Sequence, residues 1–428
     1  MTSNWKEYLL EDITEKIFSG GTPSTKKNEY WNGEFPWLSS GETRNDFIYS
    51  TEKSITEEGI KNSSTKLAKK NDIVIASAGQ GNTRGQVAFC KINTYINQSV
   101  IAVRTNETYL DPLFLFYNFK GRYRELRKIS DGHSIRGSLT TKILKRLKIK
   151  VPAIKEQKKI SSLLYSLDQR IETNNRINEK LEEMAQALFK HWFVDFEFPN
   201  ENGKPYKSSG GEMVESELGM IPKGWEVGTI KDIGEVVGGG TPSKKKNDYY
   251  TSNGIPWITP KDLSGFNKRY IKKGSIDITH KGYKNSSAKM LPKGSVLFSS
   301  RAPIGYIAIA SNEVTTNQGF KSVVPFENFG TEFVFQTLKN NIETIKNRAS
   351  GSTFKEISGG ELKKIEVILP PQNVVDKFNQ RTKKIGELIA TYEEQNERLE
   401  KLRDTLLPKL MSGEIRVPLD DEVLSGQS

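Results

Sequence analysis

The pentapeptide Gly20-Gly21-Thr22-Pro23-Ser24 occurs a second time in this chain, as Gly239-Gly240-Thr241-Pro242-Ser243. An offset of about 220 residues separates the copies, and it indicates a duplicated unit if other segments repeat in the same order. The further matches pair Trp5 with Trp225, Phe35-Pro36-Trp37 with Ile255-Pro256-Trp257, Lys61-Asn62-Ser63-Ser64 with Lys284-Asn285-Ser286-Ser287, Asn97-Gln98 with Asn317-Gln318, and Val151-Pro152 with Leu369-Pro370. The chain therefore contains one unit twice.

Each half begins with a mixed segment in which short apolar runs alternate with turn residues. Such runs predict strands. They lie at 72–76, 86–90, 97–104 and 146–151, with counterparts at 295–299, 305–310, 317–324 and 364–369. A single helix is expected at 112–128 and again at 331–347. Each half therefore predicts an α+β domain.

A long helical segment follows each mixed segment, at 156–190 and at 375–409. Apolar residues recur in both at heptad spacing and in the same phase, which is typical of coiled-coil helices. With two such helices in the chain, pairing with each other is the simplest way to bury both apolar faces. The residues expected to form the pairing face are Ile160, Leu164, Leu167, Ile171, Asn178, Leu181, Leu188, Phe378, Ile385, Ile389, Asn396, Leu399 and Leu406.

Asn178 and Asn396 occupy the same place in the two helical segments. An Asn in an apolar helix interface lowers stability but fixes register and orientation. The alternative is an exposed Asn on an ordinary surface helix. Each segment of about 35 residues would be roughly 50 Å long as a helix.

These patterns divide the chain into six segments. They are a first α+β domain at 1–154, a first long helix at 155–198, a linker at 199–224, a second α+β domain at 225–370, a second long helix at 371–414 and a C-terminal tail at 415–428. The linker is rich in Gly, Pro, Ser and charge, which is typical of a connecting segment. The expected fold class is α+β, with an internal duplication and two long coiled-coil helices.

The charge of the chain favours a polyanionic partner. The formal net charge is +12 and the pI is about 9.3, which ranks nucleic acid ahead of an anionic membrane, with a merely solvated basic surface as the alternative. Residues 120–150 contain eleven Lys and Arg against two acidic residues. The net charge of this segment, 11 minus 2, is +9.

The single cysteine and the N-terminus indicate a cytoplasmic protein. Cys90 lies in an apolar run, which predicts a buried structural thiol. The chain has no second cysteine with which it could form an intramolecular disulfide, and this is typical of a reducing compartment. The opening MTSNWKEYLLEDITEK lacks the apolar core of a signal peptide, and no run reaches the roughly 18 apolar residues of a membrane span.

Catalytic and metal-binding patterns are absent from the sequence. The three histidines, His133, His191 and His280, are widely separated and there is one cysteine, so the spacing of a zinc site is missing. No nucleotide-binding P-loop occurs. We therefore expect no metal, no cofactor and no catalytic centre.

Three pairs of loops carry the candidate DNA contacts. The turn and lysines after each Gly-Gly pair could grip a phosphate, or could be a structural turn whose glycines supply positive φ. The next pair, at 79–85 and 299–305, could read bases or form an ordinary polar hairpin, and a third pair lies at 132–136 and 351–355. The candidate residues are Thr22, Ser24, Lys26, Lys27, Gln80, Asn82, Arg84, His133, Ser134 and Arg136 in the first half, and Thr241, Ser243, Lys244, Lys245, Ser299, Ser300, Arg301, Thr353 and Lys355 in the second.

Three further segments carry a resemblance to a known family. They are AQALFKHWFVDF at 185–196, GEMVESELGMIPKGW at 211–225 and LLPKLMSGE at 406–414. Together with the two Gly-Gly-Thr-Pro-Ser turns, they closely resemble the specificity subunits of Type I restriction-modification systems. The resemblance covers essentially the whole chain.

The resemblance implies two target-recognition domains, each of which reads half of an asymmetric, interrupted sequence in double-stranded DNA. It also implies that the two long helices are antiparallel and dock two methyltransferase (modification) subunits, which bind S-adenosylmethionine and methylate adenine. Two ATP-dependent restriction subunits complete the cleaving complex. The specificity subunit itself is implied to be non-catalytic.

Two other classes of function remain open from the sequence. A stand-alone regulator or architectural DNA-binding protein could use the same two domains. A carbohydrate- or peptide-binding module with aromatic grooves would show no salt-sensitive affinity for DNA.

Overall fold

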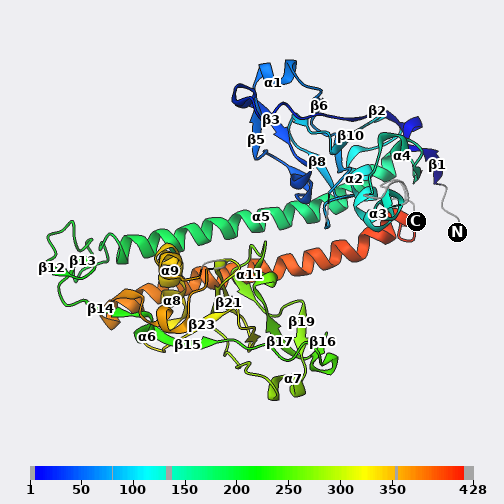
Figure 1. Ribbon diagram of the computed structural model, residues 1–428. Coiled ribbons are helices and arrows are strands. Elements are labelled where there is room, and N and C mark those ends of the chain that lie inside the picture. Colours follow the sequence, from blue (N-terminus) through cyan, green and yellow to red (C-terminus); the bar gives the residue numbers. More distant parts are fainter. Residues whose placement is uncertain (1–4, 80, 132–136, 352–354, 419–428) are drawn as a thin grey trace, which may run out of the picture. The chain divides into compact units, whose positions relative to one another are not determined.

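The structure is a computed structural model that describes residues 5–79, 81–131, 137–351 and 355–418 (Figure 1). The chain divides into two compact units, each of which is described by itself. The first unit comprises Met1–Ile171 and Arg398–Ser428, and the second comprises Glu172–Glu397. Each unit contains one α+β domain together with part of each long helix, α5 (Ile154–Phe193) and α11 (Gln372–Ser412).

The α+β domain of the first unit, residues 6–151, is here called the first head. Its five-stranded sheet has the order β2 (Thr14–Ser19), β10 (Val100–Thr105), β7 (Ile73–Ala76), β8 (Val87–Cys90) and β4 (Phe47–Ile48). A four-stranded sheet has the order β5 (Lys53–Ile55), β3 (Trp31–Leu38), β9 (Thr94–Ile96) and β6 (Lys66–Ala68). The ends of the head pair as a ribbon, β1 (Lys6–Leu9) with β11 (Lys148–Val151), and the helices are α1 (Glu57–Lys61), α2 (Pro112–Gly121), α3 (Tyr123–Asp131) and α4 (Thr141–Lys145).

The second unit contains the second head, residues 226–369, whose five-stranded sheet repeats the strand order of the first. The five-stranded sheet has the order β15 (Gly234–Gly238), β23 (Lys321–Pro325), β20 (Val296–Ser300), β21 (Ile304–Ala310) and β18 (Tyr270–Ile271). The four-stranded sheet has the order β16 (Tyr250–Thr251), β19 (Ile276–Ile278), β17 (Ile255–Ile258) and β22 (Thr315–Thr316). The terminal ribbon is β14 (Glu226–Thr229) with β24 (Glu366–Leu369), and the helices are α6 (Ile230–Ile233), α7 (His280–Lys284), α8 (Gly330–Asn340), α9 (Ile342–Arg348) and α10 (Gly359–Lys363).

The predicted duplication of an α+β domain is therefore confirmed, and β7, β8, β10 and β11 with their counterparts fall on the predicted strand ranges. The prediction of one helix at 112–128 and at 331–347 is wrong, because each is two shorter helices. The breaks lie at Arg122 and Asn341, whose N–H groups bond carbonyls both three and four residues back. This is the geometry of a helix end, and apolar periodicity does not reveal it.

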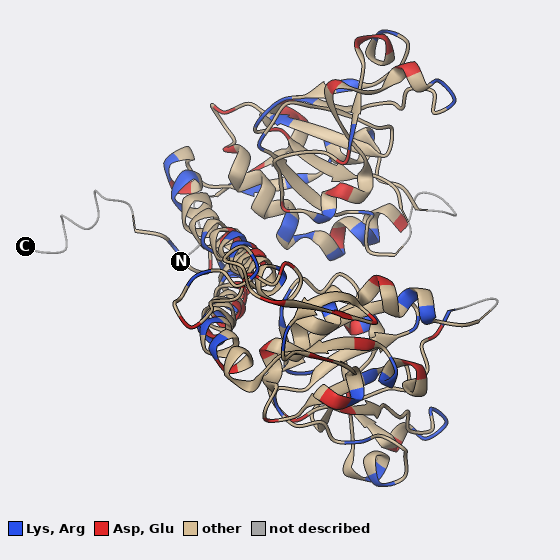
Figure 2. Ribbon diagram, turned by 90° about the vertical axis from the view of Figure 1, so that its left-hand side faces the viewer, with Lys and Arg blue, Asp and Glu red and all other residues tan. Residues whose placement is uncertain are grey.

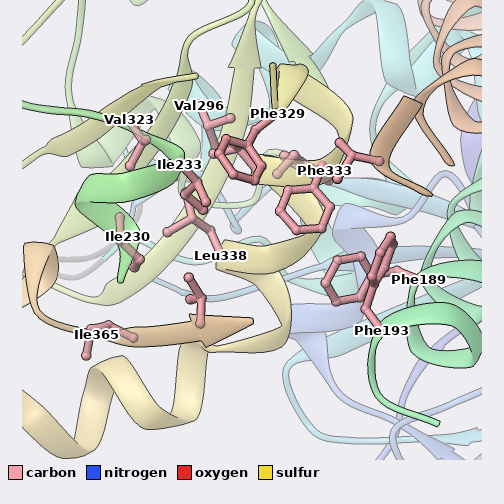
Figure 3. Packing of buried hydrophobic residues seen from close by; sticks show 14 of the residues in the cluster. Phe189, Phe193, Ile230, Ile233, Val296, Val323, Phe329, Phe333, Leu338 and Ile365 are labelled. Atoms are coloured by element: carbon pink, nitrogen blue, oxygen red, sulfur yellow. The ribbon is translucent and has the colours of Figure 1, made fainter. Parts of the chain in front are cut away.

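In each unit the long helices complete the core of the head. In the first unit Ile160 of α5 and Leu410 of α11 join the cluster that includes Phe114. In the second unit Phe189 and Phe193 of α5 pack against Phe333 of α8 and against residues of α11 such as Phe378 (Figure 3). The predicted heptad faces therefore bury part of their apolar surface against the heads. Among the predicted pairing residues, the buried ones are Ile160, Leu164, Ile171, Phe378, Ile389 and Asn396, and the half-buried ones are Leu167, Asn178, Leu181, Leu188, Ile385, Leu399 and Leu406.

The two long helices are antiparallel in each unit. In the second unit Asn174 of α5 bonds Asn396 of α11, while Phe193, near the end of α5, packs on Phe378, near the start of α11. In the first unit, Arg403 of α11 bonds Asp168 of α5. Positions late in one helix therefore meet positions early in the other.

The segment 199–224, expected as a linker, is a folded part of the second unit. It contains a hairpin of β12 (Met213–Ser216) and β13 (Gly219–Pro222). Phe198 stacks on Tyr206, with ring centroids 4.6 Å apart, and packs against Trp225 at 4.8 Å. The aromatic residues at both ends anchor the segment, although most of its residues are exposed.

Two smaller expectations concern burial and hydropathy. Cys90 is fully buried, as predicted, and burial raises the pKa of its thiol. Within the described part of the chain, no helix combines the length and apolar character needed to cross a membrane.

Candidate nucleic-acid interface

The Gly-Gly-Thr-Pro-Ser turn has the same structure in both heads. A Cβ added to Gly21 would lie 2.1 Å from Ser64 Oγ, and one added to Gly240 would lie 2.3 Å from the Ala288 nitrogen, so neither position has room for a side chain. Neither glycine has a φ in the left-handed region. The alternative in which these glycines supply positive φ is therefore wrong, and close packing of the backbone explains them instead.

Side chains fix each turn in the same way. Trp37 Nε1 donates to the Gly21 carbonyl over 3.3 Å, and Trp257 Nε1 donates to the Gly240 carbonyl over 3.0 Å. The half-buried threonines of the two turns each donate to a glutamine. These bonds join Thr22 to Gln98 and Thr241 to Gln318. The matching contacts make the turn a rigid base for the residues that follow it.

The residues after each turn are exposed and basic. Ser24, Lys26 and Lys27 in the first head, and Ser243 to Lys246 in the second, lie at the surface. Lys27 Nζ donates to the Tyr30 hydroxyl over 3.0 Å, which raises the pKa of Lys27, and Lys246 Nζ bonds Tyr249 in the same way. Each head therefore presents one basic loop, of equal chemistry, at an equivalent place. We call these the shared loops, 24–27 and 243–246; Figure 2 marks Lys and Arg along the chain in blue.

The loop at 79–85 of the first head is held by internal contacts. Arg84 is 7% exposed and forms an ion pair with Asp131 at the end of α3. Tyr123 OH donates to the Asn82 carbonyl over 2.8 Å, and Arg127 donates to the Gly81 carbonyl over 2.7 Å. Arg84 could reach a DNA base only by breaking its ion pair. The exposed Asn82 is the better candidate in this loop, and Gln80 lies outside the described residues.

The loop at 299–305 of the second head likewise contains both buried and accessible candidate residues. Ser299 and Ser300 are fully buried, and Ser299 Oγ accepts from the Tyr306 N–H over 2.8 Å and donates to the Pro303 carbonyl. Both serines are therefore inaccessible to a ligand, contrary to what a DNA-contacting residue requires. Arg301 is half-buried and lies 3.3 Å from Glu356, with its side chain 37% exposed. Arg301 remains a candidate.

The structure brings the second and third loops of the second head together. Arg301 and Glu356 form an isolated β-bridge, so the exposed Lys355 lies beside Arg301 in the chain fold. In the first head, Arg84 reaches Asp131 just before the third loop. The other candidates of the third loops, His133, Ser134, Arg136 and Thr353, lie outside the described residues.

Some of the basic residues at 120–150 pair with acidic residues of the first unit. Lys120 pairs with Asp46, and Arg122 makes two hydrogen bonds to Glu125, of 2.8 and 2.6 Å. Arg124 and Lys128, one turn apart on α3, are exposed. The count of charges therefore overstates the cluster, and the i,i+3 spacing of Arg122 and Glu125 was the sequence signal for one internal pair. Among the described residues, no group of His, Cys, Asp or Glu has the arrangement of a metal site.

Comparison with known proteins agrees with this architecture. The family model described as Type I restriction modification DNA specificity domain matches residues 2–183 and 222–407, that is, one match for each head. The chain is 27% identical to the Type I restriction enzyme HindI specificity subunit of Haemophilus influenzae, over 96% of this chain and 100% of that one. It is 44% identical to the MjaIX specificity subunit of Methanocaldococcus jannaschii, over 45% of this chain and 44% of that one, so this second match spans less than half of that relative.

A solved structure has a similar fold. The S subunit of a Type I restriction-modification system from M. genitalium superimposes with a TM-score of 0.58, over 96% of each chain and at 16% identity. At this identity the likeness concerns the fold.

Proposed function

The chain belongs to the Type I restriction modification DNA specificity domain family, and we propose that it selects the DNA target of a Type I restriction-modification complex. The observation that carries the proposal is the double match of the family domain, with one copy on each head. Each head would read one half of a bipartite site. The chain would supply recognition, and its partners would supply catalysis.

The two heads divide their DNA contacts between shared and different residues. Contacts to phosphates carry no sequence information, so two heads can use the same residues for them. The shared loops, with exposed lysines in both heads, fit this role. Base contacts must differ if the two half-sites differ. The exposed Asn82 of the first head has Ala302 as its counterpart in the second, so the second loops fit the reading of two different half-sites.

The long helices offer two equivalent apolar positions for partners. Met184 on α5 is 58% exposed, and Leu402, its counterpart on α11, is 47% exposed. The duplication therefore repeats one exposed apolar position on each long helix. We propose that each lies in the docking site of one methyltransferase subunit, which gives two copies per chain, and that restriction subunits join this cytoplasmic assembly.

Binding of DNA by the chain together with its methyltransferase tests the function. Affinity should fall by orders of magnitude between roughly 50 and 200 mM salt, and target-containing duplex should be preferred over random duplex. Equal affinity for all duplexes would overturn the proposal. Full target selection by the chain alone, unchanged by the partner, would favour the stand-alone regulator instead.

Partner docking has its own test. Met184→Glu and Leu402→Glu should each remove one of two methyltransferase copies, as measured by the mass of the purified complex. Leu67→Glu, at an exposed position on β6, is the matched control. A complex of unchanged mass in both helix variants would contradict the proposed docking positions.

A further inference from the structure

Asp46 and Arg269 occupy the same backbone position in the two heads. Asp46 immediately precedes β4, and its carbonyl accepts from the Phe89 N–H over 2.9 Å. Arg269 immediately precedes β18, and its carbonyl accepts from the Ile309 N–H over 2.9 Å. β4 pairs in parallel with β8, as β18 does with β21. One position of the repeated fold therefore carries a negative charge in one head and a positive charge in the other.

In the first unit, Asp46 faces a cation supplied by a long helix. Arg403 of α11 lies 3.9 Å from the Asp46 carboxylate and donates to Asp168 of α5 over 2.6 Å. The Tyr117 hydroxyl donates to the other oxygen of Asp168 over 2.7 Å, and Lys120 pairs with Asp46. The side chains of Arg403 and Asp168 are 13% and 4% exposed. We call Asp168 and Arg403 the first seat.

In the second unit, Arg269 faces acidic residues supplied by the long helices. Arg269 Nη1 donates to Glu182 of α5 over 2.9 Å, and its side chain is 3% exposed. Glu393 of α11 accepts the backbone N–H groups of Arg269 and Tyr270. Glu332 of α8 completes the group by pairing with Arg269. We call Glu182 and Glu393 the second seat.

The two seats differ in shape as well as in charge. The counterpart of Asp168 in α11 is Gly386, where an added Cβ would lie 2.6 Å from the Tyr270 hydroxyl and 2.7 Å from a Glu332 oxygen. Lys120 and its counterpart Lys339 are both cationic, and Lys339 donates to Glu182 over 2.7 Å. The differences in charge therefore lie at the position of Asp46 and Arg269, at the long-helix residues that face it, and at Glu332, whose counterpart in the first head is Leu113.

We propose that the charge at position 46 or 269, together with the helix charges opposite it, determines which head can pack against each seat. We call this matching of charges the charge key. An Asp at the second seat would face the acidic Glu182 and Glu393 of the long helices, where Lys339 of α8 already bonds Glu182. An Arg at the first seat would face Arg403, which already pairs with Asp168. A buried charge without its partner is strongly destabilising, so the exchange should cost more at the second seat, where the Arg269 side chain is 3% exposed, than at the first, where the Asp46 side chain is 39% exposed. This inference rests on the proposed function: by determining the place of each head, the charge key would fix the order of the two half-sites in the target.

The test is a chain with two first heads, in which residues 6–151 replace residues 226–369. Each segment begins and ends in its own terminal ribbon, β1 with β11 or β14 with β24, so the graft joins the chain at equivalent positions. One version keeps Asp46 in the grafted copy, and a second version carries Asp46→Arg in that copy alone. We expect the recoded graft to unfold in urea at a midpoint higher by about 1 M. Equal midpoints would overturn the proposal.

Point variants of the intact chain keep the test decisive if neither graft folds. Arg269→Asp should unfold at a lower urea concentration than the neutral Arg269→Met, and Glu182→Arg should restore part of the loss in Arg269→Asp. Identical midpoints for the Asp and Met variants, or no rescue, would overturn the charge key. Because unfolding is measured without DNA or partners, these results are independent of whether the chain recognises DNA.

Discussion

Asn174 of α5 donates a hydrogen bond of 2.8 Å to Asn396 of α11, and both side chains are buried, 3% exposed each. Asn396 in turn donates to Asn175 over 2.7 Å. A buried polar pair between two helices is satisfied in one register only, because a shift along either helix separates the two amides.

Replacement of one member should therefore cost more than replacement of both. Asn396→Leu leaves Asn174 buried without this partner and should lower the free energy of unfolding by about 1–3 kcal/mol. Asn174→Leu combined with Asn396→Leu should recover most of that loss. Urea unfolding of the three proteins measures it, and a double variant that is less stable than the single one would refute the pairing account.

The shared loops should contribute affinity without sequence preference. Lys26→Ala and Lys244→Ala should each weaken binding to all duplexes and reduce the slope of log affinity against log salt by about 1. Lys204→Ala, at an exposed position outside both heads, is the control. A change in the preferred target sequence, with an unaltered salt slope, would assign these lysines to base contacts instead.

Arg84 and Arg301 should behave differently despite their equivalent loops. Arg301→Ala should weaken discrimination at the half-site of the second head by about 1–3 kcal/mol, because its side chain is partly accessible. Arg84→Ala should instead lower the thermal stability of the first unit, because it removes a buried side chain together with its ion pair to the exposed Asp131. Competition binding with mutated half-sites and thermal unfolding separate the two effects, and a loss of discrimination without a loss of stability in Arg84→Ala would contradict this assignment.

Glu393 should make the folded state less stable as the pH rises. Burial raises its pKa from 4.5 to about 7, against the two backbone N–H donors and the nearby Lys268 and Arg269. The unfolded chain releases this proton near pH 4.5 and the folded chain near pH 7, so stability falls across that window. The pKa difference corresponds to about 3 kcal/mol.

Glu393→Gln should remove most of this pH dependence. Some will remain, because burial also raises the pKa of Glu332, which faces the same group. Urea midpoints at pH 5 and pH 8 for both proteins are the measurement. If the variant loses as much stability as the original chain between these values, Glu393 is not the titrating group.

The sequence predicted the repeated domains because the similarity of its two halves and the apolar periodicity can both be read directly from one sequence. It predicted Asn396 as a register residue but not its partner, since heptad phase does not reveal which positions of two antiparallel helices meet. It placed Arg84 and Ser300 among DNA contacts from composition alone. Their burial depends on Asp131 and Gly319, which are distant in the chain. Long-range contacts of this kind carry no signal in a single sequence.

Sequencing of adenine methylation in a host that expresses this chain with its methyltransferase tests the central claim most directly. Two heads with different reading loops predict one methylated motif made of two short, unequal half-sites separated by an unread gap. Half-sites about one helical turn apart correspond to a gap on the order of six or seven base pairs. A continuous motif, a palindromic motif, or methylation that does not depend on this chain would contradict the account.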